Sequence, residues 1–341
     1  MNRPTPRFLR RLNEFQASEA GSIVTIGNFD GVHLGHQAII RACRTAALSV
    51  GAPVAARVVA VTFEPLPAAV LRPERPEARL TNEHRRQELL IEAGADAVIT
   101  LETKTSLLEV EAEAFIAEVI GRLRPRAFVE GPDFYFGRNR GGNLEKLRAI
   151  CLPQGIKVVE VPPVPFDPAV GSIRRISSTA IRALIREGNV QQAALGLGRP
   201  HAVTGLVARG DGRGAGIGFP TANLSQLCEL LPAEGVYAGI ATQLPSNENI
   251  RVIAPRAAAV NIGKQPTFGG EQPRVEAHLI DHAGDLYGQS LRIELLQRIR
   301  GVVKFDGVES LVAQIRSDVE ATRRIVAESP HFARLGAGAN G

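Results

Sequence analysis

The sequence contains no tryptophan, one methionine and three cysteines, and aromatic residues make up only 5% of it. Cys43, Cys151 and Cys228 lie far apart and form no CxxC pair, so neither a disulfide framework nor a zinc knuckle is expected. This cysteine usage fits a reducing cytoplasm. No stretch approaches the roughly 18 consecutive apolar residues that cross a bilayer, so we expect no membrane-spanning segment.

The N-terminal segment, MNRPTPRFLRRLNEF, also lacks an apolar stretch, although it is rich in arginine. It therefore does not have the pattern of a secretory signal. We expect a surface arm before the first strand. A weak organelle-targeting peptide is the alternative, although the segment is poor in serine.

Acidic residues are slightly outnumbered, because 40 Lys and Arg against 35 Asp and Glu give a net charge of +5 and a pI near 9.4. The excess favours acidic partners, either nucleic acid or small anionic ligands such as nucleotides. The basic residues are dispersed and are not interleaved with aromatic residues, so nucleotide binding is favoured. A nucleic-acid-binding protein is the alternative from another class.

The length of 341 residues indicates roughly two domains of about 150 residues. The first half alternates short apolar runs with helical patterns, which predicts a parallel, doubly wound α/β sheet. The expected strands lie at 21–28, 57–63, 95–101, 126–131 and 156–161, and the expected helices at 34–50, 81–93, around 110–120, 143–151 and 178–186. In such a sheet, ligands bind beyond the carboxyl ends of the strands, where the strand order reverses.

From about residue 195 the pattern changes to period-2 runs separated by Gly, Pro, Asn and Asp, which predicts an antiparallel barrel or sandwich. The runs lie at 235–242, 256–263, 274–280 and 290–296. One strong helix is expected after them, beginning with a capping box of Asp306 and Glu309 and packing an apolar stripe on the barrel. The predicted domains are 1–194 and 195–330, with a flexible tail at 331–341.

The segment TIGNFDGVHLGH places polar side chains between a strand end and a helix start. Its glycines allow the backbone to approach a ligand closely, and the helix start offers unpaired N–H groups, so the segment predicts a phosphate site. Asn28 and Asp30 lie in the loop, and His33 and His36 share one side of the first helical turn. An HxxH pair alone can be structural, and a zinc site would need a third ligand that is not near.

Two further clusters follow in the first half. EGPDFYFGRNRGG places Asp133 and Arg138 after the strand at 126–131, and therefore at the same edge of the sheet. In RRISSTAIR, Ser177, Ser178 and Thr179 precede a helix. Taken alone, this triplet is more typical of a helix N-cap than of a ligand site.

In this order and near these spacings, GNFDGVHLGH, DFYFG with RNRGG, and ISSTAIR resemble the FMN adenylyltransferase domain of the prokaryotic bifunctional riboflavin kinase/FAD synthetases, a branch of the HxGH nucleotidyltransferases. The resemblance implies that His33 and His36 hold the triphosphate of ATP and stabilise the transition state as the FMN phosphate attacks the α-phosphorus. It also implies which residues complete the contacts to ATP and flavin: Asp133, Ser178, Thr179 and Arg182.

One position departs from the family. The sequence reads TFEPLP, with Leu66 where the family usually has a histidine that contacts phosphate. Leucine cannot donate a hydrogen bond, and losing one such contact in a transition state lowers a rate by about 10²- to 10³-fold. The alternative function is therefore a monofunctional riboflavin kinase whose first domain is impaired.

The second half contains a glycine-rich segment, RGDGRGAGIGFPTANL. Its spacing fails the Rossmann GxGxxG pattern, and it lacks the GK[ST] of a Walker loop, so a flexible turn is the plain interpretation. Thr221 and Asn223 follow two residues apart, and they present hard oxygens suited to Mg²⁺ that bridges phosphates. RVEAHLI then places Glu276 and His278 on one face of a strand and Val275, Ala277 and Leu279 on the other.

GIGFPTANL, GVYAG, NIGKQPTF, VEAHLID, DLYGQ and RGVVKFD resemble, in order, the riboflavin kinase domain of the same family. The resemblance implies Thr221 and Asn223 as Mg²⁺ ligands and Glu276 as the base on the riboflavin 5′-hydroxyl. It further implies a set of residues that contact nucleotide or flavin: Gly214, Gly216, Gly218, Asn261, Thr267 and Arg300. Arg209 and Ala215 replace the usual His and Arg of the glycine-rich flap, so an altered affinity for ATP is expected.

The sequence thus predicts a bifunctional enzyme that phosphorylates riboflavin to FMN and adenylylates FMN to FAD, using ATP and Mg²⁺. The expected architecture is an N-terminal doubly wound HxGH domain followed by an antiparallel β-barrel with a C-terminal helix. We expect small-molecule substrates, no nucleic acid and no membrane, and a monomer or transient homo-oligomer in the cytoplasm.

Overall fold

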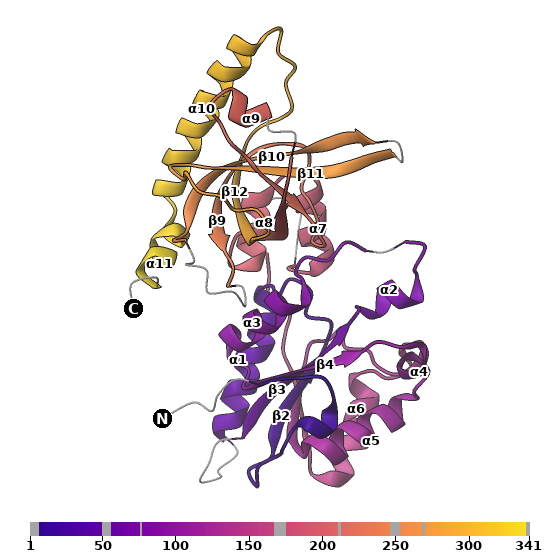
Figure 1. The fold of residues 1–341 in the computed structure, drawn as a ribbon. Helices are drawn as coiled ribbons and strands as arrows, with labels where there is room; N and C mark the ends of the chain where they lie inside the picture. The colour runs from indigo at the N-terminus through magenta and orange to yellow at the C-terminus, as the bar shows by residue number, and fades with distance from the viewer. Residues whose placement is uncertain are drawn as a thin grey trace. The chain divides into compact units, whose positions relative to one another are not determined.

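The computed structural model describes residues 7–49, 56–75, 77–166, 175–210, 213–245, 253–267 and 270–338. The chain forms two compact units, Met1–Glu77 with Glu83–Ser177, and Ala78–Asn82 with Ser178–Gly341 (Figure 1). The predicted boundary at 194/195 differs from this division. Helices α7 (Ser178–Arg186) and α8 (Val190–Leu197) belong to the second unit, because α8 packs on the barrel and buries Val190 in its core.

The first unit is built on a six-stranded sheet in the order β1-β4-β3-β2-β5-β6, with every strand pair parallel. Its strands are β1 (Arg7–Leu9), β2 (Ser22–Ile26), β3 (Arg57–Glu64), β4 (Ala97–Glu102), β5 (Pro125–Glu130) and β6 (Lys157–Glu160). The central strands are apolar and buried on both faces, as parallel sheets require. From β2 the chain continues to one side through β3 and β4, and then returns to the other side with β5, so the order reverses between β2 and β5.

Helices cover both faces of this sheet (Figure 1). One face packs against α1 (Leu34–Ser49) and α3 (Glu83–Ala93), and the other against α5 (Ala112–Leu123) and α6 (Leu144–Cys151). Neighbouring residues of β2 show the alternation, since Ile23 joins the first core and Val24 the second. Short segments complete the unit: α2 (Pro67–Leu71), α4 (Thr105–Leu108), and 3₁₀ turns at Leu12–Glu14, Arg138–Arg140 and Leu152–Gln154. The predicted doubly wound sheet is confirmed.

The second unit is built on a closed barrel in the order β10-β11-β8-β7-β12-β9, with every pair antiparallel. Its strands are β7 (His201–Ala208), β8 (Ala222–Ser225), β9 (Gly235–Gln243), β10 (Arg256–Thr267), β11 (Gly270–Leu279) and β12 (Ser290–Arg300). The barrel interior is aliphatic, with Val203, Val260, Val275 and Ile293 fully buried. Helix α10 (Val308–Ala327) packs along β9 and β10 (Figure 1). The predicted barrel with a C-terminal helix is confirmed.

Two details of the C-terminal helical region correct the sequence predictions. Helix α10 has Gly307 as its N-cap with no side-chain capping bond, so the predicted box of Asp306 and Glu309 does not form. The buried part of its apolar stripe lies toward the C-terminal end, at Val319 and Val326. The tail predicted at 331–341 also differs, because Pro330–Gly338 form a further helix, α11, and the remaining residues lie outside the described part of the chain.

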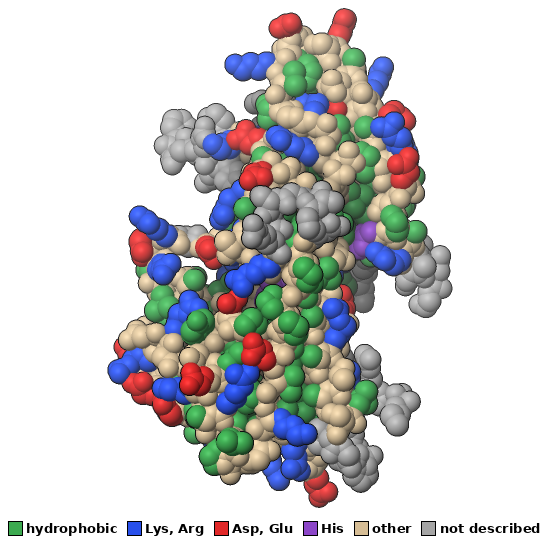
Figure 2. Space-filling model, turned by 180° about the vertical axis from the view of Figure 1, so that it is seen from behind, with side chains coloured by type: hydrophobic (Ala, Val, Ile, Leu, Met, Phe, Trp, Pro, Cys, Tyr) green, Lys and Arg blue, Asp and Glu red, His purple; other side chains and the backbone are tan. Residues whose placement is uncertain are grey.

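The segment Ala78–Asn82 interrupts the first half and docks on the second unit. Leu230 donates its backbone N–H to Arg79 O at 2.8 Å, and the Asn82 amide donates to Glu229 Oε1 at 2.7 Å. No helix within the described ranges is long and apolar enough to cross a bilayer. On the face drawn in Figure 2, basic and acidic side chains are interspersed and do not gather into a patch of one sign.

Candidate active sites

The loop between β2 and α1 is held in an unusual backbone conformation. Phe29, Gly31 and Val32 have φ values of 48°, 81° and 39°, and Phe29 and Val32 are buried. A left-handed φ is rare for a β-branched residue, and such strain persists only where the surrounding structure fixes it. The loop leads directly into the first turn of α1, at the point where the strand order reverses. This is the crevice in which doubly wound sheets bind ligands.

The two histidines of this loop lie together. The rings of His33 and His36 are stacked with centroids 3.7 Å apart, and the Phe29 and His36 rings form a T-shaped pair with centroids 5.2 Å apart. His33 Nδ1 accepts the backbone N–H of His36 at 3.3 Å, so neutral His33 carries its proton on Nε2. Burial, and then the neighbouring His33, hold the pKa of His36 well below its usual range. His36 Nδ1 is buried and has no hydrogen-bond partner among the described residues.

A buried carboxyl group fixes the end of the strand from which the loop starts. Main-chain pairing of β2 with β5 ends at Val24 and Phe128, although β2 continues to Ile26 beside β3. Glu130 bridges this gap, because its Oε1 accepts from Ile26 N at 2.8 Å and its Oε2 lies 3.3 Å from the Thr25 hydroxyl. Burial raises the pKa of Glu130 well above its usual range, against the effect of these two bonds. Sequence reasoning missed this residue, because an acidic residue at a strand end is usually solvated.

The remaining residues predicted for the first site lie in separate segments of the chain. Asp133 follows β5, is exposed, and pairs with Arg175 at 2.8 Å, while Arg138 pairs with Glu111 at the start of α5. Asn28 is exposed in the loop after β2, and Asp30 is buried. Ser177 ends the first unit.

The predicted helix at ISSTAIR is α7, which opens the second compact unit. Ser178 begins this helix and Thr179 is exposed. Arg182 is 5% exposed and its Nε donates to the carbonyl of Ala78 at 3.0 Å, so the arginine ties the docked segment to α7. The assignment of these residues to a nucleotide stays a prediction.

Leu66 lies where the carboxyl end of β3 leads into α2. It is 8% exposed and precedes Pro67, the first residue of that helix. Nearby in the sequence, Glu64 pairs with the fully buried Arg86 at 2.7 Å. Nε and Nη1 of Arg86 have no hydrogen-bond partner among the described residues. The carboxyl end of β3 thus carries Glu64, which pairs with a buried cation that has unsatisfied donors, and is followed by an apolar side chain at Leu66.

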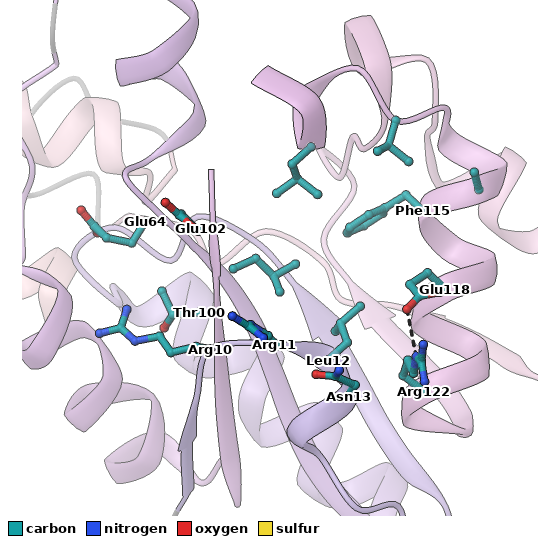
Figure 3. Close-up of a pocket in the computed structure, with 14 residues that line it drawn as sticks. Arg10, Arg11, Leu12, Asn13, Glu64, Thr100, Glu102, Phe115, Glu118 and Arg122 are labelled. Carbon is teal, nitrogen blue, oxygen red and sulfur yellow. Dashed lines mark hydrogen bonds and ion pairs between the residues drawn. The ribbon is translucent and has the colours of Figure 1, made fainter. Parts of the chain in front are cut away.

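A cavity of about 600 Å³ opens beside the ends of β3 and β4 (Figure 3). Phe115 points toward it from α5, and its wall carries charges of both signs, from Arg10, Arg11, Arg122, Glu64, Glu102 and Glu118. A pocket of this size, with apolar walls and a few charged groups, is typical of small-molecule sites.

A row of polar side chains crosses the barrel of the second unit. Asn261 of β10, Glu276 of β11 and Asn223 of β8 are direct cross-strand partners, so their side chains share one face. Val275, Ala277 and Leu279 are buried on the other face, as the alternation in the sequence predicts. Asn261 Nδ2 donates to Glu276 Oε2 at 3.4 Å.

Arg274 completes this row, and sequence reasoning missed it. Its Nη2 lies 2.7 Å from Glu276 Oε1, and its Nε and Nη2 donate to Asn223 Oδ1 at 3.3 and 3.0 Å. The Asn223 amide also donates to the backbone carbonyl of Thr221 at 3.5 Å, a contact within the same short segment. The only signal in the sequence was the two-residue spacing from Glu276, which places both side chains on the same face.

The glycine-rich segment is partly helical, with α9 at Arg213–Gly216. A Cβ at Gly214 would lie 2.4 Å from Phe219 O, so this position requires glycine, and Gly218 has a φ of 87°. A Cβ at Gly210 would lie 2.2 Å from Asn223 Nδ2. The backbone therefore packs directly on the side chain of a predicted metal ligand.

Two family models match the chain, one described as FAD synthetase over residues 15–180 and one described as riboflavin kinase over residues 197–326. Two relatives are named bifunctional riboflavin kinase/FMN adenylyltransferase. The protein from Escherichia coli (strain K12) is 34% identical over 92% of this chain and 95% of its own length. The protein from Haemophilus influenzae is 34% identical over 93% of this chain and 98% of its own length. The chain belongs to the bifunctional riboflavin kinase/FMN adenylyltransferase family. A solved structure from Streptococcus pneumoniae described as a macrolide-efflux protein is also similar, with 31% identity and a TM-score of 0.79 over 94% of this chain and 99% of that one.

Two arginines of the kinase unit that the sequence analysis singled out contact other side chains of the protein. The Arg300 guanidinium forms a paired contact with Asp318 of α10, with Nη2 to Oδ2 at 2.7 Å, and lies over the Phe305 ring. Its predicted closure over flavin stays a prediction. Arg209 lies over the Tyr287 ring at 5.9 Å, and Thr267 ends β10 with its side chain outside the described part of the structure. Ala215 and Gly216 lie in α9.

Gly210→Ala is expected to lower riboflavin phosphorylation by about tenfold, because the added methyl group must push the Asn223 side chain out of place. FAD formation from supplied FMN is expected to stay unchanged. Initial rates of both reactions check this. Gly307→Ala is the matched control, because nothing lies within 4 Å of a Cβ there. Equal kinase rates in the two variants would contradict the expectation.

Proposed function

We propose that the two activities of this enzyme are divided between its compact units, with riboflavin phosphorylated at the row Asn261, Glu276 and Asn223 and FMN adenylylated at the loop after β2. The enzyme uses riboflavin, FMN and ATP, as both family matches and the bifunctional relatives indicate. Nothing in these comparisons favours the monofunctional alternative. The observation that carries the division is the cross-strand row, which lies wholly within the barrel.

In the kinase unit, Glu276 orients the 5′-hydroxyl of riboflavin and accepts its proton as the oxygen attacks the γ-phosphorus of ATP. A carboxylate is a weak base toward an alcohol, so most of its effect comes from positioning and from late proton transfer. Asn261 supports this role by donating to the second oxygen of the carboxylate. Gly214 and its neighbours in the flap provide close backbone approach to the phosphates of the nucleotide.

Thr221 and Asn223 are proposed as the protein ligands of Mg²⁺. Their hard oxygens suit this ion, and the oxygen of Asn223 already faces a cationic group, the guanidinium of Arg274. When bound, Mg²⁺ would neutralise phosphate charge during the transfer. Gly210 keeps the Asn223 side chain in one position.

In the adenylyltransferase unit, His33 and His36 donate to the triphosphate as the FMN phosphate attacks the α-phosphorus and pyrophosphate leaves. The hydrogen bond from His36 N to His33 Nδ1 fixes neutral His33 with its proton on Nε2, and this is the atom proposed as the donor. Glu130 keeps the start of the loop in place through Ile26. Preorganised donors of this kind require no rearrangement during the reaction.

The cellular compartment, the class of partner and the oligomeric state are also proposals. Cysteine usage supports the cytoplasm, since Cys43, Cys151 and Cys228 are all free thiols in the structure. The interspersed charges of Figure 2 support small anions rather than nucleic acid as partners. We propose a monomer or a transient homo-oligomer.

Incubation of the protein with riboflavin, ATP and Mg²⁺ tests the proposal. FMN is expected to accumulate before FAD, because Leu66 provides no hydrogen-bond donor. Leu66→His is expected to raise the rate of FAD formation by about tenfold, less than the full value of a phosphate contact, because burying an imidazole at this site has a cost. Chromatography of samples over time measures both products. A complete lack of FAD in both proteins would favour the monofunctional alternative.

A further inference from the structure

Arg274 holds two residues of the kinase site at once. Its guanidinium contacts Glu276 Oε1 at 2.7 Å and donates twice to Asn223 Oδ1, at 3.3 and 3.0 Å. A carbonyl oxygen has two lone pairs, and these two N–H groups occupy both of them. The same oxygen cannot bind a metal ion while Arg274 remains in this position.

The Asn223 side chain has little freedom to turn away from Arg274. The backbone of Gly210 packs against its amide so closely that a Cβ there would lie 2.2 Å from Nδ2. Nδ2 also donates to Thr221 O. The side chain of Arg274 is 25% exposed, so the arginine is the partner that can swing toward solvent.

We propose that Arg274 is a removable internal cation of the kinase site, which pairs with Asn223 and Glu276 before the substrates bind and leaves Asn223 when metal and nucleotide arrive. This inference rests on the proposed roles of those two residues. While Arg274 is in place, both oxygens of Glu276 are also engaged, one by Arg274 and one by Asn261. Release of Arg274 therefore frees an acceptor for the riboflavin hydroxyl as well as an oxygen for the metal.

A side chain that occupies a metal-binding oxygen lowers the apparent affinity for the metal. Only the molecules in which that side chain has moved away can bind the ion. Arg274 thus sets the Mg²⁺ concentration that the kinase site requires. Arg274→Ala removes both the contact and the charge. Arg274→Lys keeps the charge but loses the paired N–H groups that fill Asn223 Oδ1.

The test is a calorimetric titration of the full chain with ADP at stepped Mg²⁺ concentrations, which reports binding without turnover. Both Arg274→Ala and Arg274→Lys are expected to lower the half-saturating Mg²⁺ concentration by about fivefold, the value of one net hydrogen bond. Arg323→Ala is the matched control, because Arg323 makes a paired contact with Asp281 in the same unit. The nucleotide site of the first unit is identical in all variants, so differences between the curves belong to the second unit.

Several results would overturn the proposal. If Arg274→Lys behaves as the wild type and only Arg274→Ala changes, charge alone acts and no displacement occurs. If neither variant changes the Mg²⁺ dependence, or both weaken nucleotide binding, Arg274 does not compete with the metal. Glu276→Gln is assayed in parallel for riboflavin phosphorylation. Full turnover there would show that the proposed function has failed, whereas failure of the Arg274 proposal appears only in the binding curves.

Discussion

Glu276→Gln is expected to reduce riboflavin phosphorylation by about 10²- to 10³-fold, the usual contribution of a positioned acid or base. Gln keeps the size of the side chain and an oxygen that can accept from Asn261, but it removes the negative charge that pairs with Arg274. The fall is expected in kcat more than in the KM for riboflavin, because the carboxylate is proposed to act on the reacting hydroxyl. Initial rates of FMN formation over a range of riboflavin concentrations measure both constants.

Two comparisons separate this effect from a loss of structure. Glu320→Gln changes an exposed carboxylate on α10 of the same unit and is expected to leave both activities unchanged. In Glu276→Gln itself, conversion of supplied FMN to FAD is expected to remain within about twofold of the wild type, because that reaction is assigned to the other unit. A variant that phosphorylated riboflavin at near the wild-type rate would remove Glu276 from the mechanism. Loss of both activities in a folded variant would argue against two separate sites.

The pattern of residues within each segment was sufficient to predict much of the fold and the central residues of each site. The buried runs at β2 to β5 are apolar on both faces, so they indicate parallel strands without any knowledge of their neighbours. Likewise, alternation in RVEAHLI separates Glu276 from the core residues Val275 and Ala277. Helix α11 also has a signal in the sequence, since Ser329 before Pro330 is a typical helix start.

Contacts between distant segments could not be predicted in this way. Arg274 and Glu130 look like ordinary charged residues near strand ends, and their roles depend on strands that only pairing brings alongside. The register of β11 with β8 places Asn223 beside Glu276, and thereby beside Arg274. The divergence of β2 and β5 after Val24 creates the gap that Glu130 fills. The docking of Ala78–Asn82 on the second unit likewise depends on a partner far along the chain, at Glu229.

A double variant, His33→Ala with His36→Ala, is expected to lower the conversion of FMN to FAD by about 10³-fold and to leave riboflavin phosphorylation unchanged. The two rings are stacked 3.7 Å apart and the main chain of one donates to the ring of the other, so each supports the position of its neighbour. The single variants are therefore expected to lose nearly as much as the double variant. FAD formation from supplied FMN and ATP measures all three.

The hydrogen bond of His33 sharpens this expectation. Because Nδ1 of His33 accepts from His36 N, we expect the ring to act on the phosphate through Nε2–H. His33→Gln places an amide N–H near the position of Nε2 and is expected to retain more activity than His33→Asn, whose shorter amide cannot reach it. His84→Ala, at an exposed histidine of α3, is the control for loss of an imidazole from the same unit.

Burial and the neighbouring His33 keep His36 neutral near pH 7. A triphosphate against the rings would favour the charged form of His36, so the free enzyme needs no charged histidine pair before ATP binds. If the double variant instead made FAD at close to the wild-type rate, the stacked histidines would be structural and the adenylyltransferase site would have to lie elsewhere in the unit.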